Sequence, residues 1–110
     1  MDHSSRIYIA GPCTGIPDYN YPAFNAEAAR LRALGYHVEN PAENQAPECG
    51  TWEAYLRIAL RQMLTCEVVA LLPGWIDSRG ATLERYTAQQ VGIAIVNASA
   101  IQEALQCQAA

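Results

Sequence analysis

Segments typical of β-strands alternate with segments typical of helices along the chain, and this alternation constrains the fold more than any other feature. Short β-rich runs occur at 6–10, 36–39, 67–72 and 93–96. Apolar residues at helical spacing occur between them at 22–34, 52–64 and 80–91, and a short last helix is expected at 99–106. Such alternation produces a parallel sheet with right-handed crossovers. The sequence therefore predicts an α/β, Rossmann-like (flavodoxin-like) three-layer sandwich with a small parallel sheet of about four strands.

Local signals mark the ends of these segments. Gly35 and Gly92 follow predicted helices, where glycine is a common C-terminal stop. Thr51 precedes the helix at 52–64 and can cap its first turn. The run EVVALL at 67–72 is the most apolar of the strand candidates and is typical of a central strand that is buried on both faces.

The length and charge of the chain exclude several protein classes. A chain of 110 residues is typical of one domain, so we expect residues 1–110 to form a single domain. No apolar run reaches the roughly 18 residues of a membrane span, and the start, MDHSSR, lacks the layout of a signal peptide. A net charge of −4 argues against a nucleic-acid polymer as partner but allows a small anionic ligand.

The cysteines give no sign of a metal site. They are scattered without a C-x-x-C pair, at positions 13, 49, 66 and 107, and the chain has two histidines. We therefore expect neither a metal nor a cofactor. Cys66 lies beside an apolar run and is expected in the core. Free thiols are typical of a cytoplasmic protein.

Three loops rich in glycine, proline and polar side chains follow the first three predicted strands: GPCTGIPDYNYP, NPAEN and PGWIDSRGATLE. Ligands of parallel α/β sheets bind outside the carboxyl ends of the strands, so we expect these loops at one edge. Gly11 and Gly15 allow a ligand to approach the backbone. The stretch 78–80 opens a helix whose free amides favour an anion, and Arg79 can add a charged fork. Alternatively, the glycines only make turns and Arg79 is solvated; three such loops together favour a site.

Glu84 is the candidate nucleophile at this edge. We expect it in the first turn of the helix at 80–91, where the helix dipole stabilises a carboxylate with or without a function. A capping role is therefore one interpretation. The other is that the carboxylate faces the ligand cleft, where an ionised glutamate can attack an anomeric carbon.

Two motifs carry a resemblance to a known family. YIAGP (Tyr8–Pro12) and SRGATLE (Ser78–Glu84) together resemble the nucleoside 2-deoxyribosyltransferase superfamily, which includes the 2'-deoxynucleoside 5'-phosphate N-hydrolases. The chain is most similar to a branch of small phage- and prophage-type proteins, and the resemblance extends from Arg6 to about Val96. It implies a Rossmann-like fold, assembly into homodimers or larger oligomers, and a nucleoside, nucleotide or nucleotide-derived small molecule as ligand.

The resemblance also implies roles for individual positions. Glu84 matches the glutamate that attacks or stabilises the anomeric carbon of the sugar. Tyr8 matches an aromatic residue near the sugar and the catalytic carboxylates. Ser78 and Gly80 match the small-residue turn that holds the 5'-phosphate in the nucleotide hydrolases.

The loop after the first strand, at Gly11 and Pro12, matches a segment that lies along the nucleotide. The aromatic residues Tyr19, Tyr21 and Trp75 have no secure match; they either stack on a base or pack in a lid or interface. The ligand-binding residues expected at this stage are Gly11, Pro12, Asp18, Tyr19, Trp75, Ser78, Arg79 and Gly80.

One position departs from the active members of the superfamily. They carry an aspartate in the second helix, eight residues before the acidic residue that opens the third strand, and the same count back from Glu67 gives Ala59. When the glycosidic bond breaks, the leaving base becomes negatively charged, and an acid or a hydrogen-bond donor must stabilise that charge. Glu43, Asp18 and Asp77 are candidates to supply that acid from a loop.

The sequence thus leaves several functions open. One is an N-glycosidase or deoxyribosyltransferase that acts on nucleosides or nucleotides, and Glu84 favours it. Another is a catalytically inactive module that senses or sequesters a nucleotide-derived signal, and Ala59 favours that. A third is a structural oligomer with a vestigial cleft. In each case a thin four-strand sheet is expected to bury an apolar face against a second copy.

Overall fold

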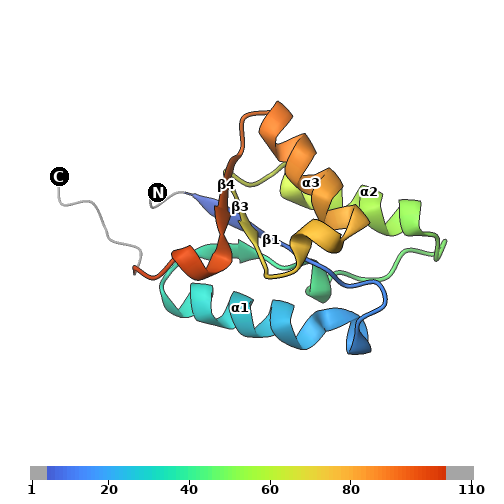
Figure 1. The fold of residues 1–110 in the computed structure, drawn as a ribbon, viewed down its shortest axis with the longest axis horizontal. Helices are drawn as coiled ribbons and strands as arrows, with labels where there is room; N and C mark the ends of the chain where they lie inside the picture. Colours follow the sequence, from blue (N-terminus) through green and yellow to red (C-terminus); the bar gives the residue numbers. More distant parts are fainter. Residues whose placement is uncertain (1–4, 104–110) are drawn as a thin grey trace.

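Four parallel strands form one sheet in the computed structural model, which describes residues 5–103 (Figure 1). They are β1 (Arg6–Ala10), β2 (His37–Glu39), β3 (Val68–Leu71) and β4 (Ala94–Asn97), in the order β2-β1-β3-β4. The described residues also form three α-helices: α1 (Tyr21–Ala33), α2 (Trp52–Met63) and α3 (Arg79–Gln90). The predicted flavodoxin-like α/β fold is confirmed.

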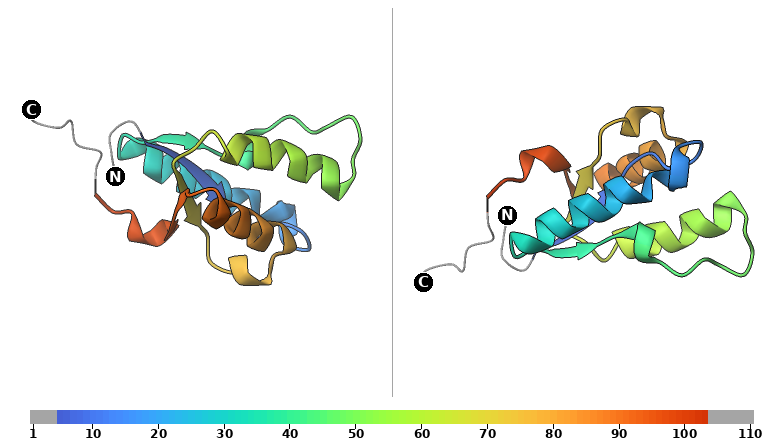
Figure 2. Two further views of the ribbon diagram at one scale, coloured as in Figure 1. Left: turned by 90° about the horizontal axis from the view of Figure 1, so that it is seen from above. Right: turned by 90° about the horizontal axis from the view of Figure 1, so that it is seen from below.

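The helices cover both faces of the sheet. α1 lies on one face, and α2 and α3 lie on the other (Figures 1 and 2). Because successive strand residues point to opposite faces, Ile7 and Ile9 of β1 face α1, while Tyr8 and Ala10 face α2 and α3. Every residue of β3 is buried, as predicted for the central strand.

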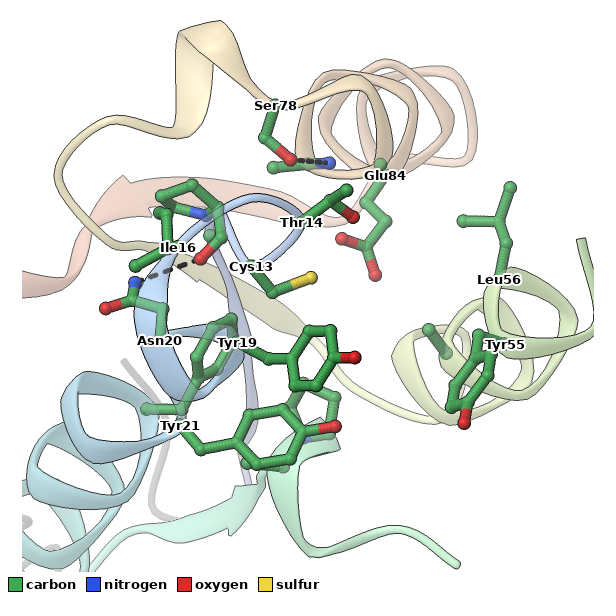
Figure 3. Close-up of a pocket in the computed structure, with 18 of the residues that line it drawn as sticks. Cys13, Thr14, Ile16, Tyr19, Asn20, Tyr21, Tyr55, Leu56, Ser78 and Glu84 are labelled. Carbon is green, nitrogen blue, oxygen red and sulfur yellow. Dashed lines mark hydrogen bonds between the residues drawn. The ribbon is translucent and has the colours of Figure 1, made fainter. Parts of the chain in front are cut away.

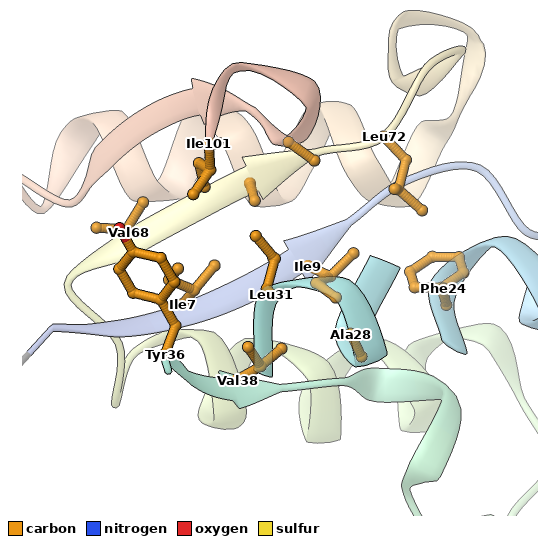
Figure 4. Packing of buried hydrophobic residues seen from close by; sticks show 12 residues of the cluster. Ile7, Ile9, Phe24, Ala28, Leu31, Tyr36, Val38, Val68, Leu72 and Ile101 are labelled. Atoms are coloured by element: carbon orange, nitrogen blue, oxygen red, sulfur yellow. The ribbon is translucent and has the colours of Figure 1, made fainter. Parts of the chain in front are cut away.

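The helical spacing predicted for α1 builds the core on its face of the sheet. Phe24, Ala28 and Leu31 are buried there and pack against strand residues that include Ile7 and Ile9 (Figure 4). Burial of one aliphatic side chain of this size contributes roughly 1.5–3 kcal/mol. This packing fixes α1 on the sheet and so fixes the loop that leads into it from β1.

Capping side chains set where α2 and α3 begin. Thr51 Oγ1 accepts a hydrogen bond from the Ala54 amide at 3.2 Å, which confirms the predicted cap. Ser78 Oγ accepts one from the Ala81 amide at 3.1 Å, so α3 begins at Arg79. Each cap satisfies one of the free amides at a helix start.

The last helix predicted at 99–106 is not present in the described residues, and 104–106 lie outside them. The chain instead makes one 3-10 turn, η4 (Ala98–Ala100). Tertiary contacts hold this segment instead: the Arg30 guanidinium donates to the carbonyl oxygens of Ala98 at 2.9 Å and Ile101 at 2.7 Å. The Ile101 side chain is also buried in the core, which fixes the chain after the turn.

Three further findings concern membranes, metals and thiols. None of the helices within 5–103 has the length and apolar character that a membrane crossing requires. In the same range, no group of three or more His, Cys, Asp or Glu side chains is placed to hold a metal ion. Cys13, Cys49 and Cys66 are free, and burial raises the pKa of the Cys66 thiol, which lies in the core as predicted. Cys107 lies outside the described part of the chain.

Candidate active site

A cavity of about 1150 Å³ opens at the carboxyl end of the sheet, beside the point where the strand order reverses between β1 and β3. Its walls come from the loops after β1 and β2, from α2, and from the segment that leads from β3 into α3 (Figure 3). The three loops expected at one edge therefore line one cavity. Its volume slightly exceeds the roughly 300–1,000 Å³ of common small-molecule sites.

Glu84 and Tyr8 form a buried pair in the wall of this cavity. Only 6% of Glu84 and 1% of Tyr8 is exposed, and the Tyr8 hydroxyl donates a hydrogen bond to Glu84 Oε2. The expected place of Glu84 in the first helical turn is wrong, because the Ser78 cap starts α3 at Arg79 and puts Glu84 in the second turn. The effect of the helix dipole is concentrated in the first turn. A capping role therefore does not explain this glutamate.

Burial controls the protonation of the pair. It raises the pKa of Glu84 from 4.5 to about 7, because a carboxylate loses its hydration there, and the Tyr8 hydrogen bond opposes the rise. Burial, together with the neighbouring Glu84, raises the pKa of Tyr8 well above its usual value. At neutral pH the Tyr8 hydroxyl thus keeps its proton, while Glu84 is close to its midpoint.

The start of α3 lines the cavity with three of the expected ligand-binding residues. Ser78 already caps the helix. The Arg79 guanidinium stacks on the ring of Trp52 from α2, 3.7 Å from its centroid, so it bridges two walls of the cavity. At Gly80, a Cβ would meet no atom within 4 Å, which leaves open space beside the helix start. Whether these residues hold a phosphate stays a prediction.

The loop after β1 brings other expected residues to the cavity. Gly11, Pro12 and Tyr19 line it. Gly11 has a packing reason of its own, because a Cβ there would lie 2.7 Å from Leu72 Cβ at the end of β3.

Two expected residues are not brought into the cavity wall. Asp18 is exposed and lies outside the lining. Trp75 packs against the core on the α2–α3 side, and the Arg85 guanidinium lies 5.1 Å from its ring centroid. A contact between a ligand and either side chain stays a prediction.

Sequence reasoning missed the contribution of α2. The apolar spacing predicted the helix without placing it at the cavity, and Met63 is its one buried residue. Trp52 and Tyr55 line the cavity instead, and the stripe ends at Leu64, which is 53% exposed. Their aromatic character near the start of α2, beside the ligand edge, was the available signal.

The cavity has few carboxyl groups besides Glu84. Ala59 lines it, at the position where the related enzymes are expected to have aspartate. Glu43 is bound by Arg32, with N–O distances of 2.6 and 2.8 Å that lower the pKa of this carboxyl, and it does not line the cavity. Asp77 does line it, on the side of α3.

Comparisons with known proteins bear on the family and the fold. The family described as "Domain of unknown function (DUF4406)" matches residues 5–97. A solved 2-deoxyribosyltransferase from the psychrotolerant bacterium Bacillus psychrosaccharolyticus superposes with a TM-score of 0.65 over 83% of this chain and 69% of its own, at 22% identity. This similarity shows a shared fold. A search of curated proteins found no match.

The raised pKa of Glu84 predicts how stability depends on pH. The folded chain holds this proton more tightly than the unfolded chain, so ionisation of Glu84 destabilises the fold progressively between pH 4.5 and about 7. The penalty in wild type is about 3 kcal/mol above that window. In urea unfolding, Glu84→Gln should therefore gain stability relative to wild type from pH 5 to pH 8. As a control, substitution of the exposed Glu48 by Gln should leave the pH dependence of the unfolding free energy as in wild type. If the unfolding free energies of Glu84→Gln and wild type ran parallel across this pH range, the prediction would be contradicted.

Proposed function

This chain belongs to the DUF4406 family, and we propose that it is a nucleoside or nucleotide N-glycosidase or deoxyribosyltransferase with Glu84 as nucleophile. The observation that carries the proposal is the Glu84 carboxylate, buried at the cavity wall and held there by Tyr8. A 2-deoxyribosyltransferase of known structure shares the fold, which supports the same assignment.

The geometry of the pair suits attack on an anomeric carbon. Tyr8 occupies Oε2, and no donor within residues 5–103 binds Oε1, so Oε1 is free to attack. The Tyr8 hydrogen bond fixes the orientation of the carboxylate and favours its charged form. Attack by Oε1 would form a glycosyl ester as the bond to the base breaks. Water would then complete hydrolysis, or a second base would complete transfer.

A 5'-phosphate would fit the start of α3. The Arg79 and Gly80 amides lie at the N-terminus of the helix, and the space beside Gly80 admits a ligand close to the backbone. The Arg79 guanidinium can keep its stack on Trp52 while its edge donates hydrogen bonds. We therefore favour nucleotides over nucleosides as substrates.

Ala59 supports a second candidate function. A methyl group lines the cavity where the related enzymes are expected to supply an acid. Without a donor for the leaving base, the same cavity would bind a nucleotide and not cleave it. The chain would then sense or sequester a nucleotide-derived signal.

Base release by the pure protein separates the two functions. Wild type is incubated with a pool of nucleosides and nucleotides, and mass spectrometry follows the release of free base. Base should be released faster from nucleotides than from the matching nucleosides. The rate should rise with pH about a midpoint near 7, because Glu84 must be ionised. Glu84→Gln should lower it by orders of magnitude and leave binding intact.

Ala59→Asp complements this test, because it restores a carboxyl group at the cavity wall. It should raise the rate of an enzyme that is limited by protonation of the base. Tight nucleotide binding with no release by wild type or Ala59→Asp would establish the binding module, and release that survives Glu84→Gln would exclude the nucleophile.

We also propose that the chain forms a homodimer or larger oligomer. Large apolar side chains outside the cavity are exposed on helices and turns around the α2–α3 side: Leu64, Ile76, Leu83, Tyr86 and Val91. The edge strand β4 carries no charged residue or proline, which are the features that usually prevent strands from pairing. Light scattering at micromolar concentration should give at least twice the mass of one chain, and a monomer would contradict the proposal.

A further inference from the structure

Three tyrosines converge on the cavity from two walls. Tyr19 and Tyr21 come from the loop after β1 and the start of α1, and Tyr55 comes from α2. Their rings border one space, and Glu84 lies on its other side (Figure 3). The rings of Tyr19 and Tyr21 are 5.9 Å apart and inclined by 42°. Exposed fractions of 63%, 39% and 46% leave these rings open to a ligand.

The turn that contains Tyr19 and leads into Tyr21 has an unusual backbone conformation. Asp18, Tyr19 and Asn20 all have left-handed conformations, with φ of 54°, 53° and 60°. Asp and Asn adopt this region more readily than other non-glycine residues, so the strain falls mainly on Tyr19, at a cost of order 1–3 kcal/mol. The Asn20 side chain holds this turn by donating to the Pro12 carbonyl at 2.9 Å.

Tyr55 lies one helical turn before Ala59, on the same face of α2. Side chains lean toward the N-terminus of a helix, so a residue at 59 would cover the turn that contains Tyr55. Tyr55 and Ala59 both line the cavity, so the α2 wall offers a phenol group where the related enzymes are expected to offer a carboxyl group.

We infer that Tyr19, Tyr21 and Tyr55 form the leaving-group site of the glycosidase proposed above, where their hydroxyls donate to the base as its bond to the sugar breaks. The inference rests on that proposed function and adds the residues that meet the leaving base. A nucleophile and a leaving group occupy opposite faces of the attacked carbon, which matches the place of Tyr19 and Tyr21 across the cavity from Glu84. Asp77, the other carboxyl of the described lining, lies on the α3 side.

Tyr21 is the least exposed of the three tyrosines. Burial raises the pKa of its hydroxyl, and the neighbouring Cys13, Tyr55 and Tyr19 add to the rise, so it stays protonated at neutral pH. A neutral phenol stabilises developing negative charge by hydrogen bonding, as preorganised donors do in other enzymes. The aromatic rings also offer a stacking surface to the base.

The step balances with these groups. Glu84 Oε1 forms a bond to the anomeric carbon, the C–N bond breaks, and its electron pair stays on the base, where hydrogen bonds from the neutral phenols stabilise it. The products are the glycosyl ester and the base anion. Water then attacks the ester and gives its proton to the base, which frees the Glu84 carboxylate as the sugar and the neutral base leave.

Leaving-group dependence tests the inference. The probes are the nucleotide that wild type cleaves fastest and p-nitrophenyl 2-deoxyribofuranoside 5-phosphate, whose phenolate leaves without a donor. Tyr21→Phe and Tyr55→Phe should each lower kcat for base release by about 10²-fold with little change in KM. Release of p-nitrophenolate should be nearly unchanged. Tyr86→Phe, on the exposed face of α3, is the matched control and should change neither rate.

Other outcomes would overturn the inference in distinguishable ways. Equal losses with both probes would mean that the tyrosines only position the substrate, and the proposed function would stand. A selective loss in Asp77→Asn alone would move the donor to Asp77. If wild type releases p-nitrophenolate but no base, the site has the nucleophile and lacks a donor for the base, which would overturn the inference. Wild type that releases neither would overturn the proposed function and the donor site together.

Discussion

The hydrogen bond between Tyr8 and Glu84 is the interaction on which the candidate site depends. It joins the inner strand β1 to α3, and each side chain is almost fully enclosed. Burial of this carboxylate opposes folding at neutral pH, since it holds the pKa of Glu84 near 7. The core residues on both faces of the sheet must offset that cost. An apolar side chain at position 84 would avoid this desolvation cost, so a glutamate buried here indicates a chemical role.

The fold surrounds this pair with two walls of different character. Tyr19 and Tyr21 belong to the wall at the start of α1, which a strained turn holds in place. The opposite wall consists of α2 and α3, whose first residues meet where Arg79 stacks on Trp52. Because the strand order reverses at β1 and β3, both walls begin at the same edge of the sheet. The arrangement puts Arg79 and Glu84 on one wall of the cavity and Tyr19 and Tyr21 on the other.

The strands and helices followed from the sequence because their signals are local. Apolar spacing gave α1, and the apolar run of β3 gave the central strand. The same spacing predicted α2 but not its place in the cavity wall, since periodicity finds the apolar face of a helix and does not distinguish a core from a cavity wall. The two motifs identified Tyr8 and Glu84 as the candidate catalytic residues, and the structure joins them by a hydrogen bond. The position of Tyr55 depends on tertiary structure, which no local pattern reveals. The same holds for the contacts that Arg30 makes with the segment after β4.

Trapping of the glycosyl ester tests the central claim that Glu84 attacks the sugar. A 2-fluoro substituent on the sugar slows formation and hydrolysis of such an ester, so a 2'-deoxy-2'-fluoroarabinonucleotide should leave the intermediate bound to the protein. After an acid quench, intact-mass measurement should show one added fluorinated sugar phosphate, and peptide mapping should place it on Glu84. Release of base with no added mass, or an adduct on another residue, would contradict the account.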